Sequence, residues 1–307
     1  MTAVFKHEIS NYFHSFTAYV FSAFLLVFVG IGAMLYNIQS AVANFEYVLS
    51  FVCLGFVVIV PILTMRVIAE ERKQKTDQLL YSLPIKTSEI VIGKYLALLL
   101  VFLIPLCIVA LYPMIFAQFG DVYLLTSYGA LFAFFLLGAA LIAIGTFISS
   151  LTENQGLAAG IAIPVILLNY YSVNLAEYVS ATALGSAMTL IILAVLLGVI
   201  VKYLTKNENL AYTVGIGLTL LIGVIYFVDS SKFEGLLPNV MKQLSLFERF
   251  HTFVNGVFDL TAIVYDVTVI IFFLFLSVQS LEKRRYNLCK SFLFIKIRDR
   301  HRAIGLL

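Results

Sequence analysis

The chain has 307 residues, of which 62% are hydrophobic and 12% are charged, and its formal net charge is +3. Its mean hydropathy of +1.01 excludes a soluble domain, which would be far more polar, and predicts an all-α polytopic membrane protein. The small excess of Lys and Arg requires no nucleic-acid partner, because basic residues act as topological signals and contacts for anionic membrane lipids.

The N-terminal segment 2–16 places Phe5, Ile9 and Phe13 at helical spacing, with polar residues such as Lys6 and Glu8 between them. This pattern predicts an amphipathic helix that lies in the cytoplasmic membrane interface. The alternative is a simple extension of the first membrane span.

Eight apolar stretches follow, and a run of roughly 18 or more apolar residues crosses the hydrocarbon core as a helix. We expect the first stretch to be a span and not a cleaved signal peptide, because its apolar run is too long and no small-residue cleavage site follows. The expected spans are residues 17–37, 48–69, 91–117, 127–150, 156–174, 183–204, 210–228 and 262–281. Within the fourth span, Gly138 and Gly145 lie on a small face that predicts close helix packing. The GxxxG at Gly156 and Gly160 is a weaker signal of the same kind.

Orientation follows from the basic residues. With the N-terminus in the cytoplasm, 17 of the 20 Lys and Arg residues fall on the cytoplasmic side, and only Lys232, Lys242 and Arg249 lie outside. The reverse orientation inverts this ratio, so we expect both termini in the cytoplasm.

Two segments outside the spans have patterns of their own. In the long outer connection, residues 240–258 carry an apolar residue every three or four positions, which predicts one or two amphipathic helices that rest on or dip into the outer leaflet. The basic cluster 282–285 ends the membrane domain 1–285, and the basic tail 286–307 is either an interfacial helix or a poorly ordered end.

Motifs for catalysis are absent from the sequence. It contains no GxxxxGK[ST] phosphate loop, no HExxH and no GxSxG, and its scattered His and Cys residues predict no metal site. Asp266 is the one acidic residue clearly inside an expected span. Its shallow depth, about one turn from the outer end, favours a water-facing or hydrogen-bonded structural group over a functional site.

The most informative segment follows the second span, which is expected to end near Ala69 and to lead into a charged turn. Thr76 is a suitable N-cap with Asp77 in the first helical turn, and Pro84 ends the helix. The segment 76–83 is therefore expected to form a short cytoplasmic helix rather than a solvated loop. Its apolar face consists of Leu79, Leu80 and Leu83.

The same segment resembles the signature that links the second and third spans of ABC-2 type transporter permeases. The matching positions are Arg66, Ala69, Glu70, Glu71, Arg72, Thr76, Leu79, Leu80, Leu83 and Pro84. Residues 5–19 and 249–260 are similar to the N- and C-terminal blocks of the branch that contains the gliding-motility permeases. The resemblance covers residues 1 to about 285, and the tail departs from it.

The resemblance implies the permease subunit of an ATP-driven exporter in the bacterial plasma membrane, with a type V exporter-like fold. This chain would carry no cofactor, since ATP and Mg would bind a separate ABC ATPase subunit, and a second permease chain would complete a homodimer or heterodimer. The sixth and seventh spans look like an inserted pair.

By the same resemblance, residues 2–16 are the connecting helix, with Phe5, Glu8, Ile9 and Phe13, and residues 76–83 are the coupling helix. The ATPase-coupling residues are Glu70, Glu71, Arg72, Thr76, Asp77, Leu79, Leu80, Leu83 and Pro84. Glu70 and Glu71 are expected to pair with basic groups nearby. The substrate path would run between the two chains, and the polar residues near its outer end are Asn169, Tyr170, Tyr171 and Asn174, for which an interfacial aromatic belt is the favoured alternative.

Two other functions stay open. An ATP-independent secondary transporter or channel would need charges buried at mid-membrane, of which the sequence offers few. A non-transporting scaffold of a motility or sensing complex is compatible with the gliding-type resemblance. The almost uniformly apolar spans do not identify a substrate.

Overall fold

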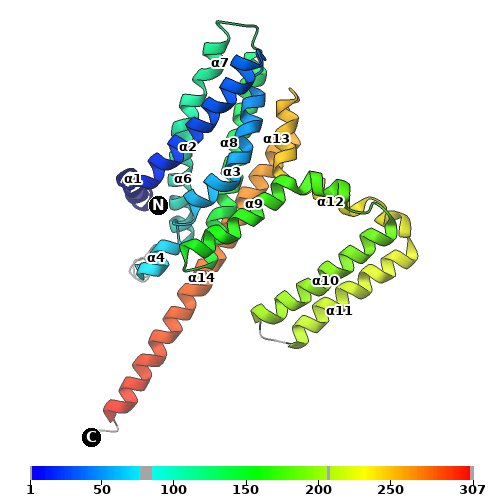
Figure 1. Ribbon diagram of the computed structural model, residues 1–307. Helices are drawn as coiled ribbons and strands as arrows, with labels where there is room; N and C mark the ends of the chain where they lie inside the picture. Colours follow the sequence, from blue (N-terminus) through cyan, green and yellow to red (C-terminus); the bar gives the residue numbers. More distant parts are fainter. Residues whose placement is uncertain (1, 77–84, 206–207, 305–307) are drawn as a thin grey trace. The chain divides into compact units, whose positions relative to one another are not determined.

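The computed structural model describes residues 2–76, 85–205 and 208–304 (Figure 1). Within these ranges the secondary structure is helical, without strands. The chain divides into two compact units, one formed by Met1–Leu167 with Arg249–Leu307 and the other by Leu168–Glu248. The predicted coupling helix lies outside the described residues, apart from Thr76.

The first unit begins with α1 (Thr2–His14), which Ser15, in an extended conformation, separates from α2. The N-terminal helix is therefore a separate element and not an extension of the first span. The further elements with residues in this unit are α2 (Phe16–Ala33), η1 (Met34–Gln39), α3 (Glu46–Thr64), α4 (Ala69–Gln74), α6 (Thr87–Val109), α7 (Leu111–Phe116), α8 (Leu124–Leu151), α9 (Gln155–Tyr178), α13 (Leu246–Val254) and α14 (Leu260–Ile304).

Six helical stretches in the described part of the chain are long and apolar enough to cross a membrane. They are Phe16–Gln39, Glu46–Gln74, Thr87–Phe116, Leu124–Leu151, Gln155–Tyr178 and Leu260–Tyr286. Each corresponds to one of the eight expected spans. A seventh arises only if Gly215–Val228 and Ser230–Leu244, which are bent by 119°, count as one broken span.

The other two expected spans, 183–204 and 210–228, are helices α10 (Ala183–Thr205) and α11 (Glu208–Val228). Helix α10 has 23 residues, and only its part Ala183–Leu196 counts as an apolar helix, of the shorter kind, among the residues described. The count of eight spans is therefore not confirmed and stays a prediction.

Helix α8 forms the centre of the first unit, and α3, α6 and α14 pack around it (Figure 1). Glycines let these helices approach closely: a Cβ atom on Gly138 would lie 2.4 Å from the ring of Phe102, and one on Gly145 would lie 2.2 Å from Thr64 Oγ1. This confirms the predicted small face. The GxxxG does not behave this way, because a Cβ on Gly160 would meet no atom within 4 Å.

In the second unit, α10 and α11 form an antiparallel hairpin in which Gly215 lies against Gly198 (Figure 1). A short 3-10 turn, η2 (Ser230–Phe233), leads into α12 (Leu236–Leu244). Ser245 separates α12 from α13. The outer segment therefore contains two short helices, as one form of the prediction expected, and the first begins at Leu236, before residue 240.

Helix α14 runs from Leu260 to Ile304 as one element and so continues past residue 281, where the last span was expected to end. The physical reason is that no Gly or Pro occurs between Leu260 and Ile304 to stop the helix. The two alternatives for the tail 286–307 stay predictions.

Candidate functional site

The main charged site of the first unit is formed by Glu8, Glu71 and Lys94, which we name the Lys94 cluster. The ammonium Nζ of Lys94 lies 2.7 Å from Glu8 Oε1 and 2.6 Å from Glu71 Oε1. Lys94 is 1% exposed, and a charge so deeply buried is tolerated only when it is paired. The cluster therefore joins three helices, α1, α4 and α6, through one side chain.

Helix α1 lies directly on α6 beside this cluster. Its protein-facing side consists of Val4, Glu8 and Tyr12, which recur every four residues and are all buried. A Cβ on Gly93 would lie 3.2 Å from Val4 Cγ1, so the glycine next to Lys94 permits the close approach. Burial raises the pKa of the Tyr12 phenol, and the nearby Glu8 carboxylate raises it further.

The junction between α3 and α4 is fixed on α8. The hydroxyl Oγ of Ser149 accepts hydrogen bonds from the backbone N–H groups of Ile68 and Ala69, at 3.2 Å each. These are donors at the start of α4 that have no partner within the helix. Ser149 also donates to the carbonyl of Met65 at 3.3 Å. The turn that leads into α4 therefore has a defined geometry set by α8.

The residues on either side of segment 77–84 are both anchored. On the N-terminal side, Lys75 is left-handed with φ of 59° and ends α4, while Glu71 is held by Lys94. On the C-terminal side, Arg285 of α14 donates to the carbonyl of Ile85 at 3.3 Å. The neighbouring Arg284 pairs with Glu153 at 2.6 Å. The chain therefore leaves and re-enters this segment at fixed points.

The predicted coupling residues divide into two groups. Asp77, Leu79, Leu80, Leu83 and Pro84 lie outside the described residues. In the described group, Glu71 makes the expected ion pair, Glu70 accepts a hydrogen bond from Gln74 at 3.4 Å, and Arg72 is buried. Both the N–H and the hydroxyl of Thr76 donate to the Glu71 carbonyl, at 3.0 and 3.3 Å.

One expectation about this segment was wrong. The charged residues after Ala69 form helix α4, not a turn, and the turn precedes them between Thr64 and Ala69. Ser149 explains the shift, because its hydroxyl satisfies the first N–H groups of α4 in place of a cap from the segment itself.

The predicted connecting-helix residues differ in burial. Phe5 and Ile9 are half-buried and Phe13 is exposed. Glu8, the acidic residue of this set, is buried. The ion pair with Lys94 accounts for this, since it compensates the carboxylate for lost hydration.

The four residues proposed for a substrate path lie in the second unit. The side chain of Asn169 donates to the carbonyl of Leu244 at 3.2 Å and accepts from the N–H of Leu246 at 3.1 Å. The ring of Tyr170 packs edge-on against Tyr171 and Phe247, with centroids 5.0 Å apart in each pair. Tyr171 and Asn174 are exposed. Asn169 and Tyr170 thus hold the α12–α13 junction.

Asp266 differs from its expected environment. It is 6% exposed, and its Oδ1 atom has no hydrogen-bond partner within the described part of the chain. It is therefore neither water-facing nor hydrogen-bonded through that oxygen. Arg249 lies near it and also stacks on the ring of Tyr265, 4.0 Å from the centroid. Asp266 lies on the buried face of α14, the helix that packs against α8. The depth of a residue in the membrane does not reveal which face of its helix it occupies.

Lys94 is the site residue that the sequence analysis missed. It was assigned to the positive cytoplasmic side, although it falls inside the expected span 91–117. An ionisable residue within a span is a functional candidate by default, and that signal alone would have identified it. No comparable signal marks Ser149 or Arg285.

The described part of the chain is that of an all-α multi-pass membrane protein, in which a separate N-terminal helix is ion-paired to the ends of two candidate spans. The family model described as "ABC-2 family transporter protein" matches residues 6–173. This is more than half of the chain, and the chain belongs to that family. The match contains the whole Lys94 cluster and confirms the resemblance to ABC-2 permeases. No curated protein matches the chain.

Proposed function

We propose that this chain is the permease subunit of an ATP-driven exporter in the bacterial plasma membrane, with both termini in the cytoplasm. Two permease chains would pack together above two separate ATPase subunits, which bind ATP and Mg. The observation that carries the proposal is the Lys94 cluster. It fastens the connecting helix to both helices that flank the coupling segment 76–83.

The proposed mechanism is mechanical. The helix 76–83 sits in a groove of the ATPase, and closure of the ATPase pair on ATP moves it. The ion pairs of 2.6–2.7 Å share the buried ammonium group of Lys94, where electrostatic contacts are stronger than in water, so α1, α4 and α6 move as one body. Displacement of the coupling helix therefore reaches both adjoining spans together with the interfacial helix. The bond from Arg285 to Ile85 extends the same movement to α14.

The experiment begins with the affinity-tagged chain expressed in its own host, followed by co-purification of an ATP-hydrolysing subunit. The rate of ATP hydrolysis is then measured for the complex in proteoliposomes and for the separated ATPase. We expect the permease to stimulate hydrolysis. Leu80→Asp and Leu83→Asp should remove most of that stimulation, because a charge replaces the apolar face that contacts the ATPase.

Lys86→Gln serves as the control, since Lys86 is exposed and lies just beyond the segment. It should stimulate hydrolysis as the wild type does. Two results oppose the proposal: a purified chain that moves its cargo without any ATPase, or Leu80→Asp and Leu83→Asp complexes that assemble and show unchanged stimulation.

A further inference from the structure

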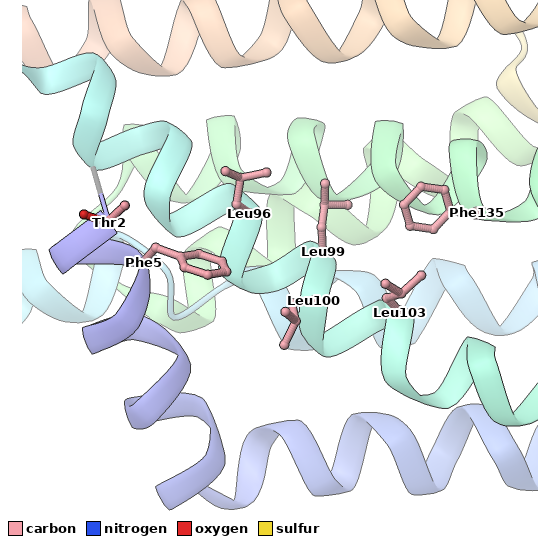
Figure 2. Close-up of a pocket in the computed structure, with 7 residues that line it drawn as sticks. All are labelled: Thr2, Phe5, Leu96, Leu99, Leu100, Leu103 and Phe135. Atoms are coloured by element: carbon pink, nitrogen blue, oxygen red, sulfur yellow. The ribbon is translucent and has the colours of Figure 1, made fainter.

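A second feature of the first unit lies outside the Lys94 cluster. An apolar groove of about 290 Å³ opens where the start of α1 meets α6 and α8. Figure 2 shows that the side chains follow one another along α6, with Thr2 and Phe5 at one end and Leu103 and Phe135 at the other. The lining residues between these ends are Leu96, Leu99 and Leu100.

The dimensions of the groove favour a chain-like occupant. Leu96 and Leu103 are seven positions apart on a helix that rises 1.5 Å per residue, so the groove runs along α6 for roughly 10 Å. Since α6 lies in the candidate span Thr87–Phe116, this direction leads from the α1 end of the span toward the middle of the membrane. A neighbouring helix is about 10 Å across, so it would need a broad surface to pack against. The groove offers only a narrow row of side chains along α6.

Polarity also changes along the groove. Thr2 is the only lining residue with a polar side chain, and it lies at the α1 end; all others are Leu or Phe. Leu103, at the far end, is 43% exposed, so the groove is open on its outer side. Next to Phe5, Lys6 is exposed on the polar side of α1. A polar and basic rim above a hydrocarbon-like channel matches an anionic amphiphile.

We propose that this groove binds one acyl chain of an anionic glycerophospholipid of the surrounding bilayer, whose head group contacts Lys6. The acyl chain lies along Leu96, Leu99 and Leu103, and its terminal part reaches Phe135. The lipid then fills the space between the first turn of α1 and α6. One turn further along α1, Glu8 of the Lys94 cluster holds the helix on α6. This inference does not depend on ATP coupling and can fail or succeed separately from the proposed function.

The probe is phosphatidylglycerol with a photoactivatable diazirine in one acyl chain, mixed into nanodiscs that contain the purified full-length chain. After illumination, labelled peptides are quantified by mass spectrometry over a range of probe fractions. We expect labelling of residues 96–103 to saturate as the probe fraction rises. Labelling near Ile108, which is exposed on the same helix outside the groove, should rise linearly because it reports ordinary bilayer contact.

Leu99→Trp is designed to fill the groove and should lower the saturable labelling at least fivefold. Ile108→Trp is the matched control and should leave it unchanged. In the wild type, unlabelled phosphatidylglycerol should compete better than phosphatidylcholine, and Lys6→Gln should reduce that difference. The competition measurement needs no substitution in the groove, so it decides the case even if Leu99→Trp fails to fold.

Three results would overturn the proposal. They are linear labelling of residues 96–103, equal competition by the two lipids in the wild type, and a cross-link from these residues to a peptide of a second copy or of another protein in place of lipid.

Discussion

Glu8 and Lys94, which are 86 positions apart in the chain, form a buried ion pair of 2.7 Å between α1 and α6. Glu71 shares the same ammonium group, at 2.6 Å. Lys94 is therefore the member of the cluster that contacts both of the others.

The first prediction concerns this cation. Lys94→Met keeps most of the length of the side chain but removes the ammonium group that pairs with the buried carboxylate of Glu8 and with Glu71. Breaking a buried pair from one side costs about 3–5 kcal/mol, so the free energy of unfolding should fall by about that amount. Thermal unfolding of the purified chain in detergent measures the change. Lys86→Met, at an exposed position just before α6, should have little effect; equal melting temperatures for the two variants would refute the role of the cluster.

The second prediction concerns alkaline pH. The pKa of Tyr12 is raised by burial, so an unfolded chain releases the phenolic proton at a pH where the folded chain still holds it. Below pH about 10, the ordinary tyrosine pKa, both states are protonated and Tyr12 causes no pH dependence. Above it, stability falls by up to about 1.4 kcal/mol per pH unit from this group.

Tyr12→Phe removes that contribution. The stability of this variant should therefore decline less steeply than that of the wild type between about pH 10 and 11, as measured by thermal unfolding at each pH. Tyr19→Phe, at an exposed position on α2, provides the control and should follow the wild-type curve. Identical slopes for all three proteins would show that Tyr12 is not buried as described.

The third prediction concerns the contact between α3 and α8. Gly145→Ala places a methyl group 2.2 Å from Thr64 Oγ1, and this overlap should destabilise the chain by about 1–3 kcal/mol. Gly129→Ala on the same helix meets no atom within 4 Å and should be neutral or slightly stabilising, because alanine favours helices. Thermal unfolding compares the two. Adding Thr64→Ala to Gly145→Ala should recover part of the loss, and no recovery would assign the effect to another contact.

The fourth prediction separates two residues that the sequence analysis grouped together. Asn169→Ala removes the hydrogen bonds to Leu244 and Leu246 at the α12–α13 junction. Each is worth about 0.5–1.5 kcal/mol, so hydrogen exchange of the Leu246 amide should accelerate about tenfold. Asn174→Ala, at an exposed position on the same helix, should leave this exchange unchanged. A loss of transport in Asn174→Ala without any change in exchange would instead support the substrate-path prediction for Asn174.

Much of the architecture was predictable because each span can be recognised by itself. Six expected spans coincide with candidate membrane helices to within a few residues, and the separate N-terminal helix and the paired outer helices were also anticipated. Family membership was predictable for a related reason. It depends on runs of adjacent residues, such as those between Arg66 and Thr76, which can be compared without knowing what they contact.

The site was less predictable. Glu71 and its need for a basic partner were anticipated, but the partner was not identified. Glu8 was placed on the connecting helix without its burial, and the burial of Asp266 was not anticipated. In each case the missing information is the rotation of one helix about its axis relative to another, which decides whether a side chain faces lipid, water or protein.

The sequence alone therefore determined the class of the molecule, the approximate limits of most spans and the family, because the transfer of an apolar segment into the membrane is nearly independent of its neighbours. Only the tertiary structure decided that Glu8, Glu71 and Lys94 meet and that Ser149 fixes the start of α4. These contacts join residues up to 86 positions apart, and they exist only because glycines such as Gly93 and Gly145 let particular helix faces come together.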